Sequence, residues 1–185
     1  MEPAFYPVLG ALIGASAVVG GALLNNQRQA RLEREKWLRG LTDAFAKDLR
    51  SAVKELATEL AKAAHSMCWL CWLARYGPSR LTQERIDKYD EEIHALLPRI
   101  FGLHAVIAGM DQKVHADLAP LVDQAVGIDA TIGAAGLQFV PGKPGTALEL
   151  ATCLDESIAL EKELPRVIAK TISGYAMFSD GRPTQ

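Results

Sequence analysis

Cysteine, aromatic residues and net charge are all scarce in this sequence. Its 185 residues include 3 Cys, an odd number and too few for a disulfide framework. Aromatic residues make up only 6% and Ala is abundant, which favours tightly packed helices over sheets. The formal net charge of −2 argues against a general nucleic-acid binder, which is usually clearly basic. Because 49% of the residues are hydrophobic, the chain can build a packed core, and wholesale disorder is excluded.

Charge is missing altogether between Glu2 and Arg28. The apolar part of this stretch, residues 6–24, would span roughly 28 Å as a helix, which is close to the hydrocarbon thickness of a bilayer. We therefore predict a transmembrane anchor over residues 1–27, helical because lipid offers the backbone no hydrogen-bond partners. A secretory signal peptide is an alternative, but its usual basic n-region is absent. The Gly and Ala content also fits a buried helix in a soluble oligomer.

A basic juxtamembrane collar follows the anchor over residues 28–40. Its five basic residues stand against two acidic ones, a net charge of +3. The basic residues are Arg28, Arg31, Arg34, Lys36 and Arg39. Basic flanks stay on the cytoplasmic side and attract anionic lipid headgroups. We expect a single-pass protein of the cell inner (plasma) membrane, with the N-terminus outside and the rest of the chain in the cytoplasm.

Small residues recur at four-residue spacing within the predicted anchor. Those expected to carry helix–helix contact in the membrane are Gly10, Gly14, Ala17 and Gly21. Small side chains let two helix backbones approach closely in lipid. This pattern predicts a homo-oligomer that associates through the anchor.

The rest of the chain predicts an all-α fold. Apolar residues from Phe45 to Ala74 recur at a mean step near 3.6, which is typical of one face of a long helix. No alternating β pattern of useful length is present. We expect a cytoplasmic antiparallel bundle of about four helices over residues 41–178 and a flexible tail over residues 179–185. The first helix of this bundle could be continuous with the anchor.

Proline, glycine and capping residues predict where the helices end. The first helix should end at residues 76–79 (Tyr-Gly-Pro-Ser), and a second should begin after Thr82. Residues 138–145 are rich in Pro and Gly and predict a loop. A last helix should begin with a capping box of Thr146 and Glu149. Breaks or kinks are expected at the internal prolines Pro98, Pro120 and Pro165.

Cys68 and Cys71 have the spacing of a redox or zinc-binding dithiol. Zinc normally needs four ligands, and no second CxxC or His pair accompanies this one. The two thiols lie in an apolar stretch, so we expect them to be small core residues. Trp69 and Trp72 share a helix face and predict either core packing or a partner surface.

Two pairs of residues raise the question of a metal site. Glu91 and His94 have the Glu-x-x-His spacing of di-iron bundles, but those sites need a second such motif and two further Glu. Asp111 and His115 form an i,i+4 pair with no evident third ligand. Helix-surface ion pairing explains both pairs more simply. We expect no metal and no cofactor, with these four residues as the alternative candidates.

Arg99 and His104 are the candidate catalytic residues. Their spacing resembles the R-x4-6-H pattern of HEPN ribonucleases, which are also helical bundles. The resemblance implies that Arg99 and His104 would act on RNA at a dimer interface. It covers six residues, and Ile100 stands where that family usually has a polar residue. A capping Arg and a half-buried His are the simpler interpretation, and nucleic acid is not an expected partner.

These patterns together favour a non-catalytic, membrane-tethered interaction or assembly module. Its expected partners are the lipid bilayer, a second copy of the chain and a protein that the sequence does not identify. Tethering confines such partners to two dimensions and raises their effective concentration. The alternatives are a membrane-perturbing, pore-forming effector and a HEPN-like ribonuclease.

Overall fold

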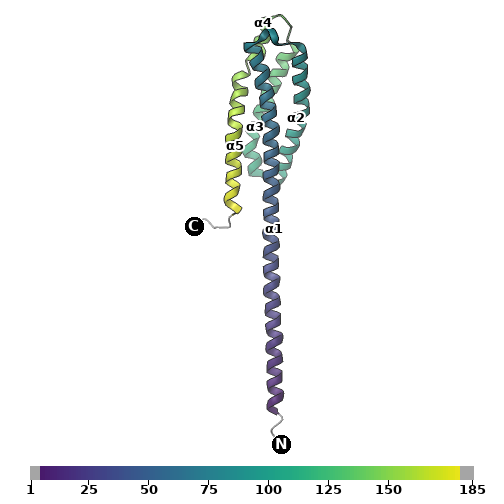
Figure 1. The fold of residues 1–185 in the computed structure, drawn as a ribbon, viewed down its shortest axis with the longest axis vertical. Helices are drawn as coiled ribbons and strands as arrows, with labels where there is room; N and C mark the ends of the chain where they lie inside the picture. The colour runs from purple at the N-terminus through teal and green to yellow at the C-terminus, as the bar shows by residue number, and fades with distance from the viewer. Residues whose placement is uncertain (1–4, 180–185) are drawn as a thin grey trace. The chain divides into compact units, whose positions relative to one another are not determined.

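The predicted all-α fold is confirmed. The computed structural model describes the backbone of residues 5–179 and the side chains of residues 25–143 and 145–173. Within these residues every regular element is a helix (Figure 1). The elements are α1 (Phe5–Tyr76), the 3-10 helix η1 (Pro78–Arg80), α2 (Gln83–Met110), α3 (Gln112–Leu137), α4 (Pro144–Ala151) and α5 (Leu154–Ser179).

The chain divides into two compact units, Met1–Phe45 and Ala46–Gln185. Helix α1 supplies the described helical residues of the first unit, and its remaining residues belong to the second. We call these units unit 1 and unit 2.

Unit 2 contains one hydrophobic core, to which every α-helix contributes. Its largest fully buried side chains are Leu49, Leu56, Leu60, Met67, Leu73, Ile93, Ile100, Ile107, Leu118, Ile128, Ile132 and Leu150. On α1, Leu49, Leu56, Leu60 and Met67 are separated by four or seven residues, which is one or two helical turns, and so share one face. Burying each such side chain contributes about 1.5–3 kcal/mol, so this stripe explains why residues 46–76 of α1 belong to unit 2.

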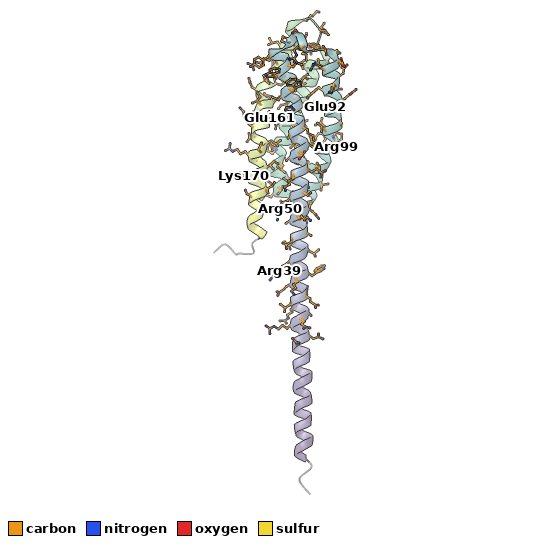
Figure 2. All side chains as sticks on the ribbon, viewed as in Figure 1. Arg39, Arg50, Glu92, Arg99, Glu161 and Lys170 are labelled. Carbon is orange, nitrogen blue, oxygen red and sulfur yellow. The ribbon has the colours of Figure 1, made fainter. Side chains whose placement is uncertain are left out.

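Side-chain contacts join neighbouring helices of unit 2, and those between α2 and α3 run in opposite directions along the two helices. On α2 and α3, Tyr89 Oη donates a hydrogen bond to Asp129 Oδ1 at 2.8 Å, whereas His104 stacks on His115. On α1 and α5, His65 lies 3.5 Å from Glu161. Figure 2 shows Glu92 of α2 and Glu161 of α5 on either side of α1. Rising residue numbers on α2 thus meet falling residue numbers on α3.

The predicted helix ends agree with the structure at three places. Helix α1 ends at Tyr76, before Gly77, and α2 begins after Thr82. The chain between α3 and α4 has no helix from Gln138 to Lys143, within the predicted loop. Gly142 in that loop has φ of +80°, a conformation that L side chains rarely adopt.

None of the three internal prolines breaks its helix, and the expected kinks there stay a prediction. Helix α2 continues through Pro98, α3 through Pro120 and α5 through Pro165. All three prolines are exposed. Water can therefore hydrogen-bond to the carbonyl group that each proline leaves without an amide donor, which lowers the cost of keeping the helix.

The capping box at Thr146 is also wrong. Helix α4 begins two residues earlier at Pro144, and the Thr146 hydroxyl is used by the preceding loop. It accepts a hydrogen bond from Val140 N at 3.1 Å and donates to Lys143 O at 2.9 Å. The expected single last helix is two helices, because α4 ends at Ala151 and α5 begins at Leu154.

Candidate functional site

The predicted collar residues are all exposed on α1. Arg28, Arg31, Arg34, Lys36 and Arg39 lie on the surface of unit 1. Arg39 lies 3.9 Å from Glu35, one helical turn away, and both side chains are largely in solvent (Figure 2). An exposed pair of this kind contributes little to stability. The collar therefore presents its positive charge to the surroundings.

Large apolar side chains are exposed in the same segment. They are Leu32, Trp37, Leu38, Leu41 and Phe45, and each is about half exposed or more. Leu38, Leu41 and Phe45 follow three- and four-residue spacing and so share one face of α1. Trp37 is the most exposed of the five, at 64%. This exposed apolar face needs a partner or a lipid surface to be removed from water.

Most of the predicted anchor is described by its backbone alone. Gly10, Gly14, Ala17 and Gly21 fall within the backbone of α1, but their surroundings are outside the part of the chain described with side chains. The proposed contacts in the membrane stay a prediction.

Among the described residues, α2 is the helix long and apolar enough to cross a membrane by length and composition. In its most apolar 18-residue stretch only 17% is buried. Phe101 and Val106 are exposed large apolar residues of α2, and Arg99 is the only Lys or Arg after Lys88 in this helix. Such length and composition alone are weak evidence for a membrane span.

An aromatic stack lies near the end of α1. The rings of Trp69 and Trp72 stack with centroids 5.3 Å apart, and the ring of Tyr76 lies 5.8 Å from that of Trp72. The guanidinium of Arg75 lies 5.7 Å from the centre of the Tyr76 ring. All three aromatic side chains are exposed, so core packing does not account for the two tryptophans. Exposed Trp and Tyr are typical of surfaces that bind partners.

A small cavity of about 140 Å³ adjoins this stack between α1 and α2. Its lining residues are Ser66, Trp69, Leu70, Leu73, Arg85, Lys88, Tyr89 and Glu92. The Ser66 hydroxyl donates to Glu92 Oε2 at 3.0 Å and closes one side of the cavity. Arg85 and Lys88 form no ion pair with any residue in the described part of the chain.

The thiols of the CxxC pair occupy the interior of unit 2. Cys71 is buried and Cys68 half-buried, and both are free. Burial, with a smaller contribution from Cys153, raises the pKa of the Cys71 thiol to about 12. Burial and the nearby Glu161 raise the pKa of Cys68. Both thiols are therefore protonated at neutral pH, which makes them poor nucleophiles and poor metal ligands.

Cys153 is a neighbour of Cys71 that sequence reasoning missed. It is buried at the junction of α4 and α5, and the Ser157 hydroxyl in the next turn donates a hydrogen bond to the backbone oxygen of Cys153 at 2.8 Å. No short-range motif joins residues 82 positions apart, so only packing of α5 against α1 brings them together. Cys71, Cys153 and Ser157 add small buried side chains to the core.

The structure pairs the histidines differently from the sequence spacing. His104 stacks on His115 with ring centroids 4.0 Å apart, and burial lowers the pKa of His104. His94 Nδ1 lies 3.3 Å from Asp90 Oδ1 rather than beside Glu91. Asp111 caps α3 by accepting hydrogen bonds from the backbone N–H groups of residues 113 and 114. Throughout the described residues no three His, Cys, Asp or Glu side chains gather to hold a metal ion.

Arg99 and His104 both lie on α2. Arg99 is exposed and points away from the core (Figure 2), whereas His104 is half-buried against His115. His104 Nε2 also lies 3.4 Å from the backbone oxygen of His115. These contacts fit the simpler interpretation of a half-buried histidine at the α2–α3 junction.

Comparison with known proteins finds no relative. No protein-family model, no curated protein and no solved structure matches this chain.

Proposed function

We propose that this chain is a non-catalytic, membrane-tethered helical module for interaction and assembly. In this proposal residues 1–27 cross the inner membrane once, residues 28–40 lie at its cytoplasmic surface, and residues 41–178 form an antiparallel helical bundle in the cytoplasm. Residues 179–185 follow as the predicted flexible tail. The observation that carries the proposal is the charged and apolar surface of residues 28–45, described next.

Basic and apolar side chains occur together on this short part of α1. Arg28, Arg31 and Arg39 supply charge, while Trp37 and Leu38 supply exposed apolar area. Anionic headgroups attract basic residues by about 1 kcal/mol each near a membrane surface. Trp is enriched at the same depth because its ring is amphipathic. The composition of residues 28–39 therefore supports a position at the membrane interface.

Helix contact within the anchor provides the proposed self-association. Replacing Gly10 and Gly14 together by Leu adds bulk where two backbones would approach, so cross-linking between full-length chains in native membranes should fall. Ser16→Leu is the matched control, since residue 16 lies on a different face of the helix. Equal cross-linking for the glycine double variant and the wild type would refute association through this face.

A membrane-perturbing effector is the second candidate, and α2 is the observation that favours it. A protein that inserts this helix, with its exposed Phe101 and Val106, would open a lesion in the bilayer. Induced expression with a membrane-potential dye separates the two functions. A tether leaves the potential intact, whereas a pore collapses it.

A further inference from the structure

Two surfaces of opposite charge lie on opposite flanks of α2. Arg85 and Lys88 line the 140 Å³ cavity beside α1, whereas Asp87 and Asp90 line a second cavity beside α3. A step of two residues turns an α-helix by about 200°. The basic and acidic pairs therefore face away from each other, and Tyr89 between them lines both cavities.

The basic surface combines two cations with exposed aromatic rings, and the one carboxylate that lines the same cavity, Glu92, accepts a hydrogen bond from the Ser66 hydroxyl. Arg85 and Lys88 are exposed, and among the described residues neither has an ion-pair partner. Trp69, which is 47% exposed, borders the same cavity and continues into the stack with Trp72 and Tyr76. We call Trp69, Trp72, Arg85 and Lys88 the basic surface.

The acidic surface combines two carboxylates with an apolar cavity. The cavity between α2 and α3 has a volume of about 330 Å³, and its apolar lining includes Ile132, Leu137 and Phe139. Leu137 at its rim is 92% exposed. Asp87 accepts a hydrogen bond from Gln83, and Asp90 lies beside His94, but neither carboxylate is paired with a Lys or Arg of the described chain. We call Asp87, Asp90 and Leu137 the acidic surface.

The two surfaces complement each other in charge and in apolar character. On the basic surface, Arg85 and Lys88 lie beside the indole ring of Trp69. On the acidic surface, Asp87 and Asp90 lie beside an apolar cavity, so the two surfaces match. The cavity volume lies at the lower end of the range of ligand pockets, roughly 300–1,000 Å³, and gives room for one large aromatic side chain. Trp and Arg are also the residue types most enriched at the energetic centres of interfaces.

We propose that the basic surface of one chain docks on the acidic surface of a second copy. Because the interface joins unlike surfaces, each docked pair leaves one basic surface and one acidic surface free, and association continues head to tail. This inference extends the proposed assembly function to unit 2. Docking through unit 2 does not require the anchor to be in a bilayer. An experiment can therefore refute the docking without refuting the membrane tether, and the reverse also holds.

Reversing charge on one surface at a time tests the docking. Two differently tagged full-length chains, both carrying Gly10→Leu and Gly14→Leu to weaken anchor contact, are solubilised in mild detergent, and one tag is captured. When both tagged chains carry Arg85→Glu and Lys88→Glu, the amount of the second chain captured with the first should be about tenfold lower than for chains without these charge reversals. The same decrease is expected when both tagged chains carry Asp87→Lys and Asp90→Lys. A mixture of the two reversed variants should restore co-capture, because each then supplies the surface that the other needs.

Two controls keep the result interpretable. Lys162→Glu with Arg166→Glu makes the same change in net charge on the exposed surface of α5 and should leave co-capture unchanged. Leu137→Ser removes apolar area from the rim of the acidic cavity without changing any charge, and should also lower co-capture severalfold. Recovery in the mixture shows that the reversed chains are folded.

Three outcomes would overturn the docking. They are no co-capture of the unreversed chain, full co-capture by each reversed variant alone, and failure of the mixture to recover. A two-fold symmetric contact through one of the two surfaces would leave full co-capture in the variant that reverses only the other surface, and this result would also overturn the docking. If the chain were not attached to a membrane, co-capture would still fall in each charge-reversed variant and recover in the mixture.

Discussion

Leu41 and Leu60 are the same residue type on the same helix, yet α1 places them in opposite surroundings. Leu41, in unit 1, is 49% exposed, whereas Leu60, in unit 2, is fully buried. Five of the thirteen exposed large apolar side chains in the described residues lie between Leu32 and Phe45. The helical apolar pattern alone therefore does not tell whether a stripe is covered. In unit 2 the neighbouring helices cover it, and in unit 1 we expect lipid or a second chain to do so.

Truncation of Leu60 should have the largest effect of the changes that probe this comparison. Leu60→Ala removes a fully buried side chain and should lower the free energy of unfolding by about 2–5 kcal/mol. Leu41→Ala on the same helix should change it by less than about 0.5 kcal/mol. Denaturant unfolding of full-length protein in detergent measures both. Equal losses for the two variants would mean that α1 is covered along its whole length.

Loss of the Tyr89 hydroxyl should have the next largest effect. Tyr89→Phe leaves Asp129 without the hydrogen bond that joins α2 and α3, at a cost of about 1.5–3 kcal/mol because the acceptor is charged. The ring of Phe fills the same space, so packing is kept. The same unfolding experiment gives the difference. If Tyr89→Phe were as stable as the wild type, this contact would not hold the two helices together.

Alkaline pH should weaken unit 2 through Cys71. The pKa of this thiol is raised from its ordinary 9.0 to about 12 in the fold, so the unfolded chain loses its proton first. The stabilisation from the protonated thiol is complete below pH 9 and is lost as pH rises from 9 to about 12, at about 1.4 kcal/mol per pH unit. Cys71→Ala should flatten the slope of stability against pH in this range. Parallel slopes for the variant and the wild type would contradict the burial of this thiol.

Asp111→Ala should lower the free energy of unfolding by about 1 kcal/mol, because it removes the cap at the start of α3. Asp111→Asn should recover most of this loss, because an amide oxygen can also accept hydrogen bonds from the backbone N–H groups. Thermal unfolding followed by circular dichroism separates the two variants. An equal loss in both would assign the effect to the charge of Asp111 rather than to capping.

Arg39→Gln should have the smallest effect on folding. The pair with Glu35 is exposed on one helix, so its removal should change the free energy of unfolding by at most about 0.5 kcal/mol. Binding of the full-length protein to vesicles that contain anionic lipid should weaken, since the collar loses one positive charge. Unchanged binding would show that the collar does not contact headgroups.

Local features of the sequence were enough to predict the helical class and several helix ends. Gly77 and Pro78 stop a helix by their backbone chemistry, and Thr82 lies where a helix begins, whatever the rest of the chain does. The stripe of α1 between Leu49 and Ala74 was also predictable, since its period is that of a helix. These features depend on neighbours within one or two turns.

Features that depend on packing were not predictable in the same way. The sequence does not show that Pro98 faces solvent, where the helix can tolerate it, or that the loop uses the hydroxyl of Thr146. Contacts between residues far apart, such as Cys71 with Cys153, arise only when helices meet. The exposure of Trp69 belongs to this group, because the same spacing fits either a core or a partner surface.

Carbonate extraction of membranes from cells that express the full-length protein tests the central claim most directly. The account predicts that the chain sediments with the membranes at high pH and is released only by detergent, as expected for a helix that crosses the bilayer. Recovery of the intact chain in the supernatant, without detergent, would contradict the anchor and the membrane-tethered function together.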